Sequence, residues 1–135
     1  MTLDDLKAKY PGAETFRFGD SQELCDWLLH LVRTGKKTAT CNTVDFFGKD
    51  AEPMPVVGRR DIALDWDGNP SVVIETVEVT QRRFNEVDAD FALAEGENDS
   101  LEGWRRDHRG FFERTVGWSP DMMLICERFK VVEVV

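Results

Sequence analysis

Hydrophobic positions in the first third of the chain recur with the period of an α-helix. The stripe is clearest before Gly35, where apolar side chains stand three or four residues apart at Leu24, Leu28, Leu31 and Val32. Asp20 and Glu23 are suited to cap the start of this helix, and Gly35 is suited to end it. The elements predicted here are a helix, a short extended segment and a longer helix, over residues 2–10, 14–18 and 21–34.

After Gly35 the pattern changes to the β-branched and alternating residues of strands. An irregular loop is predicted over residues 45–58, because prolines, glycines and acids interrupt the pattern there. Asp67-Gly68-Asn69 is a strong turn signal between two strands. The predicted strands cover residues 38–44, 59–66, 70–84 and 122–135.

A helical segment separates the last two predicted strands. Asp88 or Asp90 can cap a short helix that ends at Gly96, and the residues after Asp99 predict a second helix with one buried face. Strands that are distant in sequence must then pair around a small core. We therefore expect residues 1–135 to form one α+β domain, a small, partly closed β-barrel with helices packed outside.

Composition restricts the possible partners and locations. With 41% hydrophobic and 32% charged residues and no long apolar run, the chain is expected to be cytoplasmic, with no membrane partner. The net charge of −9 opposes non-specific binding to long polyanions, so the expected partner is a small substrate or a short nucleic-acid segment. The three cysteines are too widely spaced to indicate a disulfide framework or a zinc site.

Candidate chemistry is concentrated in Gly35-Lys36-Lys37-Thr38-Ala39-Thr40, where a helix passes into a strand. A purely structural explanation also exists, because lysines at a helix C-terminus favour its dipole and threonines favour strands. A phosphate-binding loop is excluded, since such a loop runs from strand to helix and requires a glycine where His30 stands.

Three segments together resemble the ASCH domain family, over about residues 16–133. They are the 35–40 junction, the turn Pro55-Val56-Val57-Gly58, and Ala94-Glu95-Gly96-Glu97 with the following Ser100-Leu101-Glu102-Gly103-Trp104-Arg105. The resemblance implies a fold similar to PUA, a small β-barrel associated with RNA recognition. It implies either an amidohydrolase of acetylated cytidine with a Lys, a Thr and a Glu as its catalytic set, or an RNA-binding module or ribonuclease.

The family pattern Gly-x-Lys-x-x-Thr falls on Gly35, Lys37 and Thr40. The family acid falls on Glu95 or, less well, on Glu97. The resemblance therefore implies Lys37, Thr40 and Glu95 as catalytic residues, with N-acylated cytosine nucleosides as the first substrates to try. The chain is longer than the small amidohydrolases, and its 46–55 loop and its helix with Trp104 leave the substrate open.

Amide hydrolysis requires a nucleophile, a base and an acid. Thr40 can supply the hydroxyl, and Glu95 can protonate the leaving amine or relay a proton to Lys37. Lys37 can be the base only if its pKa falls well below about 10.4, through burial or a nearby cation such as Lys36. Binding without turnover requires no lowered pKa, whereas RNA cleavage requires Lys37 or Glu95 to activate a ribose hydroxyl. Strand residues three apart face opposite sides, so Lys37 and Thr40 can meet only if Lys37 belongs to the turn or if its long side chain wraps round.

Six further residues are assigned to substrate binding: Lys36, Thr38, Arg59, Arg60, Glu97 and Trp118. The arginines would form a phosphate-binding rim if they lie near Lys37, and solvated surface charge is the alternative. Trp118 is expected to lie near a ligand and to stack on a base.

Cysteine and histidine chemistry is the less favoured hypothesis. Cys41 and His108 could form a nucleophile pair, but a lone cysteine beside a strand is more often a small core residue. No cofactor and no metal are expected, since no cluster of His, Cys or carboxylate residues has ligand spacing in the sequence.

Overall fold

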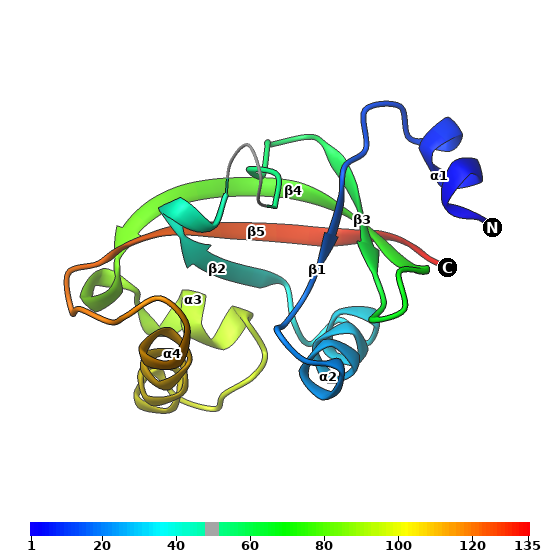
Figure 1. Cartoon of the computed structure of the whole chain (residues 1–135). Helices are drawn as coiled ribbons and strands as arrows, with labels where there is room; N and C mark the ends of the chain where they lie inside the picture. Colours follow the sequence, from blue (N-terminus) through cyan, green and yellow to red (C-terminus); the bar gives the residue numbers. More distant parts are fainter. Residues whose placement is uncertain (48–51) are drawn as a thin grey trace.

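The computed structural model describes residues 1–47 and 52–135, and Figure 1 shows their arrangement. Residues 48–51, which belong to the predicted loop, lie outside the described part. The elements in chain order are α1 (Leu3–Lys9), β1 (Thr15–Arg17), α2 (Gln22–Arg33), β2 (Ala39–Thr43), η1 (Val44–Phe46), β3 (Arg60–Leu64), β4 (Pro70–Arg83), η2 (Phe84–Glu86), α3 (Ala89–Ala94), α4 (Leu101–Thr115) and β5 (Met123–Val134). The predicted helices and strands are confirmed to within a few residues.

The five strands form one sheet in the order β1-β3-β4-β5-β2. β1 is parallel to β3, and the other neighbouring strands are antiparallel. The α+β class is confirmed, but the predicted barrel is wrong, because β1 and β2 lie at opposite edges of a sheet that is not closed. Two register shifts between β4 and β5, at Val73/Ile74 and Thr76/Glu78, bend the sheet without joining its edges.

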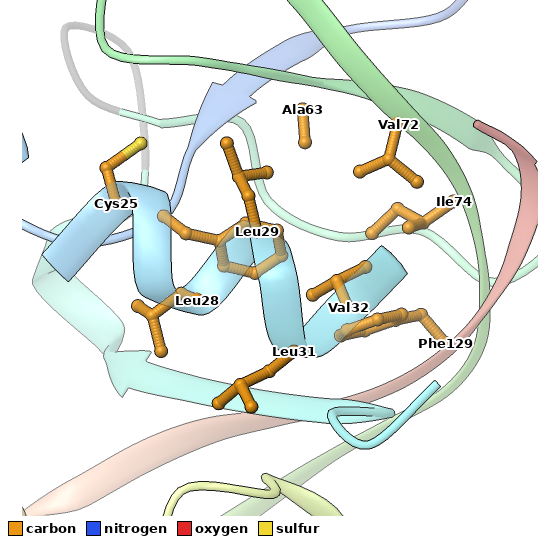
Figure 2. Packing of buried hydrophobic residues seen from close by; sticks show 10 residues of the cluster. Cys25, Leu28, Leu29, Leu31, Val32, Ala63, Val72, Ile74 and Phe129 are labelled. Carbon is orange, nitrogen blue, oxygen red and sulfur yellow. The ribbon is translucent and has the colours of Figure 1, made fainter. Parts of the chain in front are cut away.

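Both faces of the sheet carry apolar side chains, and helices cover them. Figure 1 shows α2, α3 and α4 on one side of the long strands β4 and β5. Leu28, Leu29 and Val32 of α2 pack against residues of β3, β4 and β5, as Figure 2 shows from close by. On the opposite face, Leu6 of α1 packs against Ile62 and Val73. Alternate residues of β3 and β4 are therefore buried on opposite sides.

A second cluster joins α3 and α4 to the far half of the sheet. It contains Phe84, Phe91, Trp104, Phe112 and Leu124. α2 and α4 thus cover two separate apolar clusters on the same side of the sheet. The 35–40 junction, which leads from α2 into β2, lies between the two helices in the chain.

Local capping explains where the helices begin and end. The cap of α2 is Ser21, whose hydroxyl accepts a hydrogen bond from the Leu24 amide at 3.2 Å, and the predicted Asp20 cap is wrong. Asp88 caps α3 as predicted. Gly35 has a φ of 81°, a conformation that favours glycine, and it turns the chain out of α2 as predicted.

Candidate functional site

A cavity of about 540 Å³ opens between α2, α4 and the sheet, a size typical of small-molecule sites. Its walls include seven aromatic side chains from four segments of the chain: Phe16, Phe18, Trp27, Phe46, Phe47, Phe111 and Phe112. Its polar lining includes Lys37, Thr40, Cys41, Asp61, Glu95, Glu97, His108 and Glu127. The predicted Lys37, Thr40 and Glu95 therefore face one space.

Lys37 enters this cavity because the backbone after α2 is held by two neighbouring elements. The amides of Lys36 and Lys37 both donate to the Leu31 carbonyl, at 2.9 and 3.0 Å, and the Thr38 amide donates to the Ala94 carbonyl at 2.8 Å. β2 starts only at Ala39, so Lys37 belongs to the turn. This confirms the geometric condition under which Lys37 and Thr40 can face the same space.

Gly96 brings the acids close to this turn. Its φ is 74°, and a Cβ atom at this position would lie 2.5 Å from the Lys36 carbonyl oxygen. Only a glycine fits without displacing backbone atoms. The loop carrying Glu95 and Glu97 can therefore pack directly on the backbone of Lys36 and Lys37.

Lys37 lies between both candidate acids. Its Nζ atom is 3.2 Å from Glu95 Oε1 and 2.8 Å from Glu97 Oε2, and the lysine and Glu95 are each only 1% exposed. Both candidate acids therefore contact Lys37 and line the cavity, with Glu95 fully buried and Glu97 partly exposed. We call Lys37, Glu95 and Glu97 the lysine cluster.

The second oxygen of Glu95 is surrounded by donors that sequence reasoning placed elsewhere. Trp104 Nε1 donates to Oε2 at 2.6 Å, Cys41 Sγ at 3.3 Å, and His108 Nε2 lies 3.5 Å away. His108 Nδ1 is 2.9 Å from the Trp104 carbonyl oxygen. Since a carbonyl oxygen only accepts, Nδ1 carries a hydrogen. Glu95 is thus a buried carboxylate that is fully hydrogen-bonded.

These contacts fix the charges of the lysine cluster. Burial alone would lower the pKa of Lys37, but the Glu95 and Glu97 carboxylates together raise it above its ordinary value. Burial would raise the pKa of Glu95, but Lys37 and His108 lower it to about 2. Lys36 is exposed and gives no neighbouring cation inside the site. Lys37 could act as a base only with a lowered pKa, and its pKa is raised instead. The lysine is therefore an ammonium and Glu95 a carboxylate.

Asp61 and Glu127, which we call the acidic pair, line another part of the cavity and were not predicted as site residues. Burial raises the pKa of Glu127 to about 7, against the lowering effect of the Thr76 hydroxyl, which donates to Oε2 at 2.7 Å. Asp61 is 5% exposed and accepts from Arg59 Nε at 2.8 Å. In the sequence, Glu127 stood out only as one of the charged residues, with Arg128 and Lys130, that interrupt the apolar and aromatic residues of the final strand.

Five predicted substrate-binding residues do not line the cavity: Lys36, Thr38, Arg59, Arg60 and Trp118. Lys36 and Thr38 are exposed. Arg60 pairs with Glu75 at 3.0 Å, and Trp118 packs against Phe84, with the Arg109 guanidinium 4.1 Å from its ring centre. Among the residues that the structure describes, the lysines and arginines that line the cavity besides Lys37 are Arg17, Arg106 and Arg114. The predicted arginine rim thus does not line the cavity, although Arg59 bonds to Asp61, which does.

Cys41, Glu95 and His108 form a cluster of possible metal ligands that their spacing in the sequence did not reveal. One ligand atom of each lies within 4.8 Å of the other two. Burial and the Glu95 charge raise the pKa of the Cys41 thiol well above its ordinary value, so the thiol remains protonated. Glu95 is already paired with the Lys37 ammonium, which repels a cation. The cluster therefore fits a hydrogen-bond network around Glu95 better than it fits a metal.

Comparison with known proteins places this geometry in a family. The ASCH domain family matches residues 14–133. The crystal structure of an ASCH domain from Lactobacillus crispatus JV V101 is 34% identical, with a TM-score of 0.79 over 95% of this chain and 84% of that chain. Protein EF3133 from Enterococcus faecalis V583 is 33% identical, with a TM-score of 0.80 over 98% of this chain and 90% of that chain.

More distant comparisons add only the fold. The Y47F mutant of ZmASCH from Zymomonas mobilis is 12% identical, with a TM-score of 0.50 over 91% of this chain and 73% of that chain. No curated protein matches the chain significantly. None of the helices that the structure describes is long and apolar enough to cross a membrane.

Proposed function

The chain belongs to the ASCH domain family, and we propose that its cavity binds a nucleoside and hydrolyses an acyl amide on the base, as in an N-acylated cytosine nucleoside. One observation carries the proposal: Lys37, Thr40 and Glu95 line a single cavity of about 540 Å³. A hydroxyl, a cation and a carboxylate in one water-restricted space are the groups that amide hydrolysis uses.

The walls suit a planar base. Phe16, Phe18 and Phe47 are among the aromatic lining residues, and stacking of a base on an aromatic ring contributes about 1–3 kcal/mol. Glu97 is half-buried and can accept a hydrogen bond from a base N–H. An acidic lining also disfavours a long polyanion, in agreement with the net charge of −9.

In the proposed reaction, the Thr40 hydroxyl attacks the acyl carbon. The Lys37 ammonium stabilises the negative charge that develops on the carbonyl oxygen and donates a proton to the departing amine. Glu95 keeps Lys37 charged and oriented through the 3.2 Å contact. These roles replace the initial hypothesis of a neutral Lys37 and a protonated Glu95, because the pKa of Lys37 is raised and that of Glu95 is lowered to about 2.

The test is incubation of the purified protein with N4-acetylcytidine, with cytidine and acetate measured by chromatography. Thr40→Val removes the hydroxyl at almost constant volume and is expected to lower the rate at least about 100-fold. Thr43→Val is the matched control, since Thr43 belongs to the same strand and lies outside the cavity lining. No product from the wild-type protein, or an unchanged rate in Thr40→Val, would contradict the proposal.

Binding of a nucleoside or of one base of a short RNA without turnover is the second candidate. The raised pKa of Lys37 favours it, because a permanent ammonium suffices for binding. Equilibrium dialysis with N4-acetylcytidine and with a short RNA measures binding, and product analysis of the same samples measures acyl release or RNA cleavage. Bound ligand recovered intact identifies a binding module, whereas shortened RNA identifies a ribonuclease.

A further inference from the structure

The proposed reaction requires an acceptor for the Thr40 proton, and both carboxylates of the lysine cluster are already in contact with the Lys37 ammonium. Lys37 is an ammonium and can only donate. Glu95 Oε1 is bonded to Lys37, and its Oε2 accepts from Trp104 and Cys41. Glu97 Oε2 is bonded to Lys37 at 2.8 Å. A carboxylate without a cation in contact is the better proton acceptor, and the cavity lining contains one outside the lysine cluster.

Glu127 is the carboxylate placed directly across from Thr40. The antiparallel pairing of β2 with β5 sets Thr40 opposite Glu127, and both line the cavity. Opposite residues in an antiparallel pair project from the same face, with Cβ atoms about 4.5–5.5 Å apart. Thr40 and Glu127 therefore project from the same face of the sheet at directly paired positions.

The carboxylate of Glu127 is held on one side and open on the other. Thr76, from the third strand β4, donates its hydroxyl to Oε2 at 2.7 Å. Among the described residues, no hydrogen bond is made to Oε1. One oxygen therefore fixes the orientation of the group while the other remains available for a proton.

From this geometry we propose that Glu127 is the catalytic base that takes the proton from the Thr40 hydroxyl, an inference that rests on the proposed amide hydrolysis. As the Thr40 oxygen bonds to the acyl carbon, its proton moves to Glu127 and the carbonyl π electrons move to oxygen, beside Lys37. Collapse breaks the carbon–nitrogen bond, and the leaving amine takes a proton from Lys37. Water then attacks the acyl-threonine and gives its proton to Lys37, and the Thr40 oxygen takes back the proton from Glu127 as the ester bond breaks. The net reaction consumes one water and releases the acid and the amine.

The charges around Glu127 suit this exchange. Burial and the Asp61 carboxylate raise its pKa, whereas the Thr76 hydroxyl, Arg59 and Lys37 lower it, and the result is about 7. A base with a pKa near the working pH is present in both protonation states and can accept and return a proton efficiently.

The test compares the pH dependence of N4-acetylcytidine hydrolysis in the wild-type protein and in Glu127→Gln. Glutamine retains an oxygen to accept from Thr76 but cannot take a proton, so we expect the rate to fall at least about 100-fold. We also expect the wild-type rate to rise through the region of pH 7 and this rise to vanish in the variant. Glu127→Asp retains a carboxylate and should restore part of the rate and part of its rise with pH. Glu78→Gln is the control, since Glu78 is an exposed carboxylate of the adjacent strand β4, outside the cavity lining.

Each outcome decides between the two proposals. If the wild-type protein hydrolyses the substrate and Glu127→Gln keeps its rate and pH rise, the inference is wrong and the proposed function stands. A lower rate with an unchanged pH rise, in a variant that is at least as stable as the wild type, identifies a structural role and also overturns the inference. No turnover by the wild type overturns both.

Discussion

The lysine cluster and the acidic pair bury carboxylates in the same cavity with opposite results. Glu95 is buried among donors, and its pKa falls to about 2. Glu127 is buried beside a single hydroxyl, and its pKa rises to about 7. Burial raises the pKa in both places, so the difference comes from the number and charge of the partners.

This difference separates two tasks. At the lysine cluster, Lys37 is paired with two carboxylates, and the raised pKa of Lys37 and the pKa of about 2 of Glu95 keep both groups charged near neutral pH. At the acidic pair, Asp61 is bonded to Arg59 but Glu127 has no cation in contact among the described residues. Outside the reaction step itself, Lys37 and Glu95 therefore hold their charges near neutral pH, whereas Glu127 can gain or lose a proton there.

The largest expected effect comes from breaking the lysine cluster. Lys37→Met leaves the buried Glu95 carboxylate without its cation, and we expect a loss of about 3–5 kcal/mol in the free energy of unfolding. Urea unfolding at pH 7 measures it. Lys36→Met is the matched control, because the neighbouring lysine is exposed, and it should change stability by less than about 0.5 kcal/mol.

A double variant sharpens this result. Lys37→Met combined with Glu95→Gln removes both charges, and it should recover part of the stability lost in Lys37→Met alone. Equal stability of the single and double variants would contradict the interpretation that the uncompensated carboxylate causes the loss.

At the acidic pair the same kind of substitution should stabilise the protein. The pKa of Glu127 is higher in the folded state than its ordinary value, so the folded protein retains the proton and loses stability as the pH rises through about 7. Glu127→Gln has no proton to lose. Its advantage over the wild type should be small at pH 4 and grow to the order of 3 kcal/mol at pH 8.5.

Urea unfolding of both proteins at several pH values measures this advantage. Glu78→Gln is the control, and its difference from the wild type should stay nearly constant with pH because Glu78 is exposed. A constant difference for Glu127→Gln would show that Glu127 ionises in the folded protein as it does in the unfolded chain.

A smaller loss is expected where a hydrogen-bond donor is removed from Glu95. Trp104→Phe deletes the N–H that donates to Oε2 at 2.6 Å, and bonds to charged groups contribute about 1.5–3 kcal/mol. Trp118→Phe is the control, because the Trp118 N–H donates no hydrogen bond among the described residues. Equal unfolding free energies for the two variants would contradict the role of Trp104 in holding Glu95.

Sequence reasoning was sufficient where the signal was local. The 3.6-residue period located α2, the turn at Asp67-Gly68-Asn69 located the β3–β4 connection, and the 35–40 junction pointed to Lys37. The closure of the sheet was not predictable in this way. It depends on how far two register shifts bend β4, and a strand pattern carries no such information.

The rest of the site depends on contacts between residues far apart in the sequence. The period of α4 indicated that Trp104 and His108 share its buried face, but it did not show that Glu95 lies under them. Glu127 was visible only as one break in a strand, and a break of this kind equally fits a solvated position. The strand pairing that sets it opposite Thr40 is what gives it a partner.

The smallest effect is predicted at Arg60, which the sequence assigned to substrate binding and the structure places outside the cavity lining. Its guanidinium pairs with Glu75 at 3.0 Å and is about half exposed, so Arg60→Ala should change the free energy of unfolding by less than about 0.5 kcal/mol. Ligand affinity should also stay within about twofold of the wild type in equilibrium dialysis with N4-acetylcytidine. Arg17→Ala is the contrasting variant, since Arg17 lines the cavity. A loss of affinity in Arg60→Ala that matches the loss in Arg17→Ala would indicate that the ligand binds outside the cavity. The contrast between the lysine cluster and the acidic pair would then have no bearing on ligand binding.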